Sequence, residues 1–224
     1  MKAKTVKLGR LYLTMKSRFG FLNWWPGETK DEIVIGAILT QNTSWKNVEK
    51  AIKNLKEENV LSISKIAACK TAYLEELIRP SGFYKQKASR LKGFASHVIK
   101  RYGTLDKMFR KNEKELRKEL LSLNGIGNET ADSIILYAAE KPVFVIDAYT
   151  KRIMGRVYGF KEKELEYQNL QKLIQEKIQT DVTLYKDFHA QFVELAKNYC
   201  KKEPLCENCP INKNCKYDVN EKLS

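Results

Sequence analysis

Four cysteines near the C-terminal end of the 224-residue chain are the side chains best suited to bind a metal. They lie in the stretch "CKKEPLCENCPINKNC" with the spacing C-x5-C-x2-C-x5-C, and they are Cys200, Cys206, Cys209 and Cys215. One C-x2-C pair with longer arms and a following proline favours a [4Fe-4S] cluster, whereas zinc more often takes two C-x2-C pairs. We therefore predict an iron-sulfur loop over residues 200–215. Zinc, or a loop that only anchors the C-terminal segment, is the alternative.

A second stretch, "LNGIGNETAD" at residues 123–132, places Gly125 and Gly127 on either side of one isoleucine. Apolar residues at helical spacing precede and follow it, which predicts a helix-hairpin-helix at about 115–139. Glycine permits backbone conformations and close approaches that a Cβ would block. The amide N–H groups at the start of the second helix are then able to bind a phosphate group. A plain corner between two helices is the alternative interpretation.

Asp147 follows an apolar run and opens a basic amphipathic helix in "VFVIDAYTKRIMGR". Its position predicts an N-cap, a role that favours the ionised carboxylate. A fixed anion of this kind is able to stabilise positive charge that develops on a nearby sugar. On the helix that follows, we expect Lys151 and Arg152 to bind phosphate groups and not to perform chemistry.

The hairpin, the aspartate about twenty residues later and the four-cysteine loop resemble the helix-hairpin-helix DNA glycosylases of the endonuclease III superfamily. "GAILTQNT" resembles the family's buried helix with a DNA-facing glutamine, and "SGFYKQKASRL" resembles its G-x-Y-x-x-K-A segment. The first cysteine arm has five residues where six is usual in the family. The resemblance implies double-stranded DNA with damaged bases as the partner. It also implies a group of DNA-binding residues: Gln41 or Asn42 as the filler of the gap left by a flipped base, a second filler from the turn at Ser81, and His189 close to the DNA.

Glu129 is the residue at which this chain departs from the strand-cutting members of that superfamily. They carry a lysine two residues after the second glycine, and its amine attacks the sugar to form a Schiff base. Glutamate cannot form an imine, so the resemblance implies a monofunctional glycosylase without lyase activity. In such an enzyme Asp147 would stabilise oxocarbenium-like charge on the deoxyribose and orient or deprotonate a water molecule. The pattern does not support Lys151 as a substitute nucleophile.

The bases on which such an enzyme would act are indicated by further short motifs. "WWP", "LTQNT" with an aromatic residue two positions later, "RPSGFYKQKASRL" and "GIGNETAD" are similar to the bacterial 3-methyladenine DNA glycosylases on this scaffold. Electron-rich indole rings stack favourably on a positively charged alkylated purine. The implied base pocket consists of Trp24, Trp25, Pro26, Trp45 and Glu129.

Three other interpretations stay open. The tryptophans are also compatible with ordinary core packing. The same scaffold could serve a glycosylase for uracil, mismatched thymine or oxidised pyrimidine, with or without lyase activity. A non-catalytic DNA-binding or iron-sulfur redox module is a function of a different class.

The elements that must position these residues are predicted to be helices throughout. Apolar residues recur at intervals of three and four, which indicates an all-α fold. Thr29 and Glu32 form a capping-box pattern ahead of an apolar helix that we place at the centre. We expect two helical subdomains flanking a DNA-binding cleft. Residues 30–145 contain the hairpin and form one of them, and residues 146–224 form the other together with residues 1–29.

The charge of the chain also points to a polyanionic partner. Lys and Arg number 41 against 27 Asp and Glu, a formal net charge of +14. Such an excess favours nucleic acid, although it also occurs in basic proteins whose lysines only maintain solubility. The chain has no run of apolar residues long enough for a membrane span. We therefore expect a cytoplasmic, nucleoid-associated monomer without a membrane partner.

Overall fold

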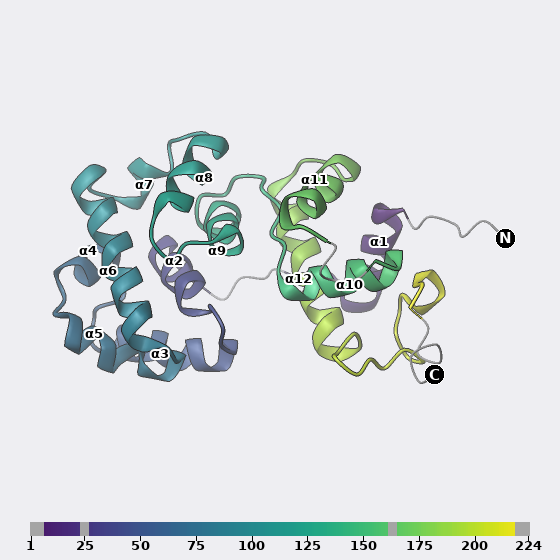
Figure 1. Ribbon diagram of the computed structural model, residues 1–224, viewed down its shortest axis with the longest axis horizontal. Coiled ribbons are helices and arrows are strands. Elements are labelled where there is room, and N and C mark those ends of the chain that lie inside the picture. Colours follow the sequence, from purple (N-terminus) through teal and green to yellow (C-terminus); the bar gives the residue numbers. More distant parts are fainter. Residues whose placement is uncertain (1–6, 23–26, 161–164, 218–224) are drawn as a thin grey trace. The chain divides into compact units, whose positions relative to one another are not determined.

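The computed structural model describes residues 7–22, 27–160 and 165–217 (Figure 1). Every regular element within these ranges is a helix, so the predicted all-α fold class is confirmed. The chain divides into two compact units. One consists of Trp25–Lys141, and the other combines Met1–Trp24 with Pro142–Ser224. No helix in the described ranges is long and apolar enough to cross a membrane.

The unit from Trp25 to Lys141 surrounds helix α2, Lys30–Leu39. Thr29 Oγ1 accepts a hydrogen bond from the Glu32 amide at 3.1 Å, and the Glu32 carboxylate accepts one from the Glu28 amide at 3.2 Å. The reciprocal bond therefore goes one residue earlier than in the usual capping box. Val34 to Leu39 are buried on all sides, which confirms the central position predicted for this helix.

The other helices of this unit cover α2, and α3, α6, α9 and η2 contact it directly. η2 is a π-helix that continues α9, and all of its residues are buried. The elements are α3 (Trp45–Glu57), α4 (Ile63–Ala68), α5 (Thr71–Ile78), η1 (Arg79–Ser81), α6 (Tyr84–Arg101), α7 (Leu105–Met108), α8 (Glu113–Ser122), α9 (Asn128–Ser133) and η2 (Ile134–Ala138).

The second unit is built on helix α12, which contacts both α1 and α10. An aromatic cluster fills its core: Phe188 and Phe192 stack with their ring centroids 4.7 Å apart, and Phe144 packs edge-on against both. Buried Asp187 accepts hydrogen bonds from Tyr12 and from the Leu22 amide, which ties the N-terminal segment to α12. The elements are α1 (Leu8–Phe19), α10 (Ala148–Tyr158), α11 (Tyr167–Lys177), α12 (Val182–Asn198) and η4 (Asn212–Asn214).

Candidate functional site

Asp147, itself in an extended conformation, stands between a buried segment without regular secondary structure and helix α10. Residues 143–146 are buried, and the segment ends where Asp147 caps the helix. Its Oδ1 accepts a hydrogen bond from the Thr150 amide at 2.6 Å. Its Oδ2 lies 3.6 Å from Nε2 of buried His189 on α12, and 13% of the Asp147 side chain is exposed. The structure thus brings together two residues that the sequence had only suggested separately.

This environment favours the ionised form of the Asp147 carboxyl. Burial alone would raise its pKa, but the neighbouring His189 and the hydrogen bond from Thr150 outweigh burial and lower the pKa below the ordinary value. A carboxylate with a lowered pKa is a weak base and a persistent anion. It is therefore better suited to stabilise a cation than to remove a proton from water.

Helices α8 and α9 form the predicted hairpin, and the turn between them contains both glycines. Gly125 has a φ of +78°, a left-handed conformation that L side chains rarely adopt. Gly127 has a φ of −91°, which any residue can adopt, and it caps α9 from an exposed position. Arg117 of α8 donates to Asp132 Oδ1 at 2.7 Å and to Asn128 Oδ1 at 2.9 Å. These bonds fix the second helix of the hairpin against the first.

Gln41, just after α2, is bonded to this turn. Its Nε2 donates to the Gly125 carbonyl at 2.9 Å and to Thr130 Oγ1 at 3.0 Å, and Arg90 donates to its Oε1. A Cβ on Gly125 would lie 2.3 Å from Arg90 Nε, so Arg90 also occupies the space under the turn. Gln41 would have to leave these partners in order to fill a gap in DNA. The next residue, Asn42, is exposed and has a φ of +52°.

The turn before α6 presents a different side chain from the one that the sequence suggested. Ser81 is buried, and its hydroxyl donates to the Ile78 carbonyl at 2.7 Å. Phe83, two residues later, has a φ of +47° and is 63% exposed. Sequence reasoning missed Phe83, although an aromatic residue directly after Gly82 in a turn was an available signal. A side chain that reaches DNA from this turn is better sought at Phe83 than at Ser81.

Lys87 holds this turn against the end of α2. Its buried ammonium donates to the Leu39 carbonyl at 2.8 Å and to the Ser81 carbonyl at 2.6 Å. Burial, together with the charge of Arg90, lowers the pKa of Lys87 to about 8. The two loops that carry Gln41 and Phe83 are therefore joined through one side chain.

The residues predicted to form the base pocket are only partly described. Trp24, Trp25 and Pro26 lie outside the described residues. The Trp45 ring packs on α2, where a Cβ at Gly36 would lie 3.2 Å from its Cη2. Glu129 is exposed in the first turn of α9.

The two basic residues predicted to bind phosphate differ in their surroundings. Lys151 places its ammonium 5.9 Å from the centre of the Tyr167 ring. Arg152 donates to the Cys200 carbonyl at 2.9 Å and stacks over Tyr149. Arg152 therefore helps to hold the cysteine loop.

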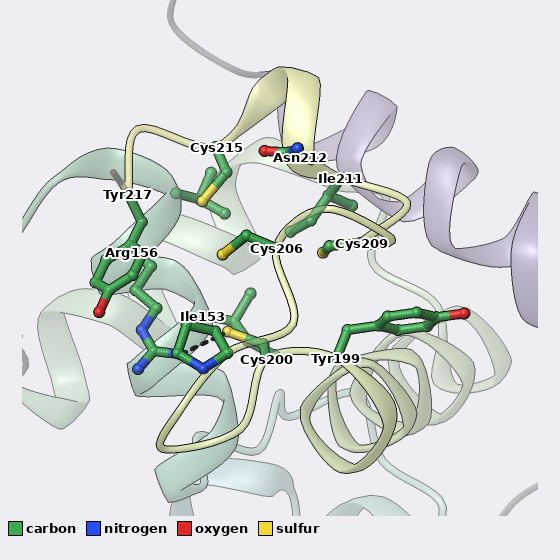
Figure 2. Close-up of a pocket in the computed structure, with 12 residues that line it drawn as sticks. Ile153, Arg156, Tyr199, Cys200, Cys206, Cys209, Ile211, Asn212, Cys215 and Tyr217 are labelled. Carbon is green, nitrogen blue, oxygen red and sulfur yellow. Dashed lines mark hydrogen bonds between the residues drawn. The ribbon is translucent and has the colours of Figure 1, made fainter. Parts of the chain in front are cut away.

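Figure 2 shows that the four cysteines of the predicted metal loop line a single pocket together with Arg156. Arg156 donates to the Cys200 sulfur at 3.1 Å and to the Lys201 carbonyl at 2.7 Å. Within the described ranges, no three His, Cys, Asp or Glu side chains are grouped closely enough to hold a metal ion. The structure therefore does not show the predicted iron-sulfur centre, although its donors share one pocket.

The chemistry of the four thiols still suits a metal. Burial raises the pKa of Cys209 to about 11 and also raises that of Cys215. Ionised thiolates at these positions therefore need compensating positive charge, as thiolates that bind metals do. Arg156 supplies part of that charge, because its guanidinium contacts one of the sulfurs.

Comparison with known proteins finds a relative named as a DNA repair glycosylase and one named as an endonuclease III. MJ1434 of Methanocaldococcus jannaschii, a protein assigned to the DNA repair glycosylases, is 47% identical over 209 residues, which cover 92% of this chain and 94% of the relative. Endonuclease III of Thermotoga maritima is 30% identical over 188 residues, covering 83% of this chain and 82% of the relative.

A solved structure is similar over most of the chain. The H. pylori 3-methyladenine DNA glycosylase MagIII, bound to 1,N6-ethenoadenine, superposes with a TM-score of 0.77 at 30% identity. The match covers 86% of this chain and 98% of the other. The model of the HhH-GPD superfamily of base excision DNA repair proteins matches residues 35–180, which include the hairpin and Asp147. The chain therefore belongs to this superfamily, that of endonuclease III.

Proposed function

We propose that the protein is a monofunctional DNA N-glycosylase of base excision repair, which flips a damaged base and hydrolyses its bond to deoxyribose. The observation that carries the proposal is the fixed carboxylate of Asp147, held as an anion between the Thr150 amide and His189. Helix capping alone does not require these surroundings, since Asp181 caps α12 from an exposed position. The family supports the glycosylase class, and we propose double-stranded DNA that contains damaged bases as the partner.

Asp147 would act mainly as an anion. As the glycosidic bond breaks, positive charge develops on the sugar ring, and a carboxylate close to the ring stabilises that charge. The N-cap hydrogen bond fixes Oδ1, while Oδ2 faces His189 at 3.6 Å. This arrangement also leaves an oxygen able to orient the attacking water. An alkylated purine is a good leaving group, so little acid catalysis is required of the protein.

The absence of lyase activity rests on Glu129, which occupies the position of the lysine in strand-cutting relatives. Its carboxylate cannot attack the sugar as an amine. The exposed position in the first turn of α9 places Glu129 beside the glycine turn proposed to hold the phosphate backbone. We therefore propose hydrolysis alone, which leaves an intact strand with an abasic site.

Alkylated purines such as 3-methyladenine are the proposed substrates. The similarity to a 3-methyladenine glycosylase supports this choice, and so do the aromatic residues Trp24, Trp25 and Trp45, which form the proposed pocket together with Pro26 and Glu129. The second candidate is an endonuclease III-type activity on oxidised or mismatched pyrimidine or uracil. It is favoured by the equally similar endonuclease III relative.

Duplexes that each contain one lesion distinguish these candidates. We expect abasic sites from a duplex with 3-methyladenine or ethenoadenine, and smaller amounts or none from uracil, mismatched thymine or oxidised pyrimidine. Strands should break only after treatment with alkali, because Glu129 cannot form an imine. The measurement is gel electrophoresis of the labelled strand with and without alkali.

Three results would contradict this proposal, the first two in part and the third as a whole. Breakage without alkali, or a borohydride-trapped adduct between protein and DNA, would show lyase activity. Faster release of a pyrimidine lesion would show that the proposed substrate class is wrong, while the proposed glycosylase activity would stand. Release of no base from any duplex would favour a binding or redox module.

We also propose a [4Fe-4S] cluster held by Cys200, Cys206, Cys209 and Cys215. The role of the cluster would be structural. It would fix the loop of residues 200–215, which Arg152 and Arg156 of helix α10 bond. The shared pocket and the bonds from these arginines to the loop support the proposal.

Protein purified without oxygen should be brown and contain about four iron atoms per chain. Cys206→Ser should lose most of the iron, whereas Cys69→Ser, which changes a cysteine outside the loop, should keep it. Iron content and visible absorbance are the measurements. A colourless, zinc-containing preparation would rule out the cluster.

DNA binding itself is proposed to proceed through phosphate contacts from the glycine turn and from Lys151. The protein is proposed to act as a monomer in the cytoplasm, close to the nucleoid. The net charge of +14 supports the association with DNA.

A further inference from the structure

Helix α11 bonds the main chain of the buried segment that leads to Asp147. Gln175 Oε1 accepts a hydrogen bond from the Phe144 amide at 2.8 Å, and Gln171 Nε2 donates to the Phe144 carbonyl at 2.6 Å. One turn earlier, the Tyr167 hydroxyl accepts from the Ile146 amide at 3.3 Å. Three side chains of a helix thus bond three main-chain groups of one segment.

The spacing of these side chains along the helix matches the spacing of the main-chain groups that they bond. Tyr167, Gln171 and Gln175 are four residues apart, so they form one stripe along α11. Tyr167 and Gln171 are separated by about 6 Å of helix rise, while Phe144 and Ile146 are about 6.6 Å apart in an extended chain. In an extended segment the main-chain groups of alternate residues point to the same side. The helix and the segment run in opposite directions at this contact, since Gln175 and Gln171 bond Phe144 whereas the earlier Tyr167 bonds the later Ile146.

The segment needs these partners because it is buried and no strand occurs in the described part of the chain. Phe144 and Ile146 are 0% and 1% exposed, so their main-chain groups cannot rely on water. An unsatisfied buried amide or carbonyl costs about 1–3 kcal/mol. The stripe residues are half-buried, whereas Gln168 and Lys172, which lie beside the stripe, are exposed. The stripe therefore determines the path of the chain into Asp147.

We infer that Tyr167, Gln171 and Gln175 are positioning residues for Asp147, and this inference rests on the proposed function. They do not contact the reacting atoms. They fix the main chain up to Ile146, the residue before Asp147, and thereby fix where the carboxylate begins helix α10. Tyr167 reaches this region twice, since its ring also lies under the Lys151 ammonium. A small displacement of a catalytic group lowers the rate of the chemical step more than it lowers binding.

Removing the stripe's hydrogen bonds should slow base release without weakening DNA binding. For Gln171→Met combined with Gln175→Met, we expect a single-turnover rate about tenfold to a hundredfold lower than that of the wild type. The DNA dissociation constant should stay within about twofold. Gln168→Met makes the same change at an exposed position of the same helix and should leave both quantities unchanged.

Two substitutions of identical chemistry separate positioning from a general loss of stability. Gln175 must accept, because its partner is an N–H, and Gln171 must donate, because its partner is a carbonyl. Gln175→Glu keeps the acceptor and should restore the rate lost in Gln175→Met. Gln171→Glu replaces the donor by a carboxylate against a carbonyl oxygen and should lower the rate at least as much as Gln171→Met. Gln168→Glu controls for the added charge.

Hydrogen exchange at the Phe144 amide gives a readout that does not depend on activity. The amide should exchange faster in Gln175→Met and stay protected in Gln175→Glu. Equal effects of the two Gln→Glu substitutions, or unchanged exchange in Gln175→Met, would overturn the inference.

If Asp147→Asn stops base release while the double Met variant retains the full rate, the inference fails and the proposed function stands. A wild type that releases no base contradicts the proposed function, and the Phe144 exchange then decides on the stripe alone.

Discussion

Replacing Asp147 by asparagine should lower the rate of base release by about a hundredfold to ten-thousandfold and leave DNA binding intact. Asparagine has the same shape but no charge, so the sugar cation loses its stabilising anion. It is also as good an N-cap as aspartate, and its side-chain oxygen can still accept from the Thr150 amide. Affinity for DNA should be maintained or increase, because a negative charge is removed beside a polyanion. Single-turnover kinetics and equilibrium DNA binding measure the two effects.

Asp181→Asn provides a control that matches the change in both chemistry and structural role. Asp181 caps α12 as Asp147 caps α10, accepting from the Leu184 amide at 2.7 Å, but it is exposed. Its replacement should leave the rate of base release unchanged. If both variants lost the rate equally, a loss of helix capping would explain the result. If Asp147→Asn retained the wild-type rate, the proposed role of the carboxylate would be wrong.

The sequence was sufficient for the features that depend on local chemistry. An apolar run, an aspartate and an amphipathic helix are enough to identify an N-cap, and the structure shows one at Asp147. The glycine turn could also be predicted from the sequence, and Gly125 in this turn adopts a left-handed conformation that favours glycine. The periodicity of apolar residues predicted the fold class because an amphipathic helix must bury one face.

Features that depend on long-range contacts could not be predicted in the same way. Turn residues are normally exposed, so Ser81 was expected to reach outward, but Lys87 bonds its carbonyl and the turn buries it. Gln171 and Gln175 resemble ordinary surface glutamines, because their partner is the main chain of a residue far earlier in the sequence. The cysteine spacing indicates which ligands are available, but it does not determine how their sulfurs are arranged.

Glu119 should stabilise the Trp25–Lys141 unit in a way that depends on pH. Its carboxylate, 9% exposed, accepts from His97, Tyr102 and Lys111, each at 2.6 Å. Burial alone would raise its pKa, but these partners outweigh burial and lower the pKa from 4.5 to about 2. A shift of that size corresponds to about 3 kcal/mol of folding free energy at neutral pH.

The direction of the pH effect follows from the lowered pKa. Well above pH 4.5 the carboxylate is ionised in both the folded and the unfolded chain, and the full stabilisation is present. As the pH falls toward about 2, the unfolded chain takes up the proton first, so the stabilisation is lost. In urea unfolding of the full-length protein followed by circular dichroism, Glu119→Gln should be about 3 kcal/mol less stable at pH 7. The two proteins should approach equal stability near pH 2, because the carboxyl is then fully protonated in the unfolded wild type and about half protonated in the folded one.

Glu115→Gln makes the same substitution at an exposed position of the same helix, α8. It should change stability by less than about 1 kcal/mol at any pH, since its side chain is exposed near the N-terminus of the helix and makes no ion pair within the described ranges. A constant difference between wild type and Glu119→Gln from pH 7 to pH 2 would show that the substitution disturbs packing and not charge. In that case His97, Tyr102 and Lys111 would hold α6 and α8 together through contacts other than their bonds to an ionised Glu119.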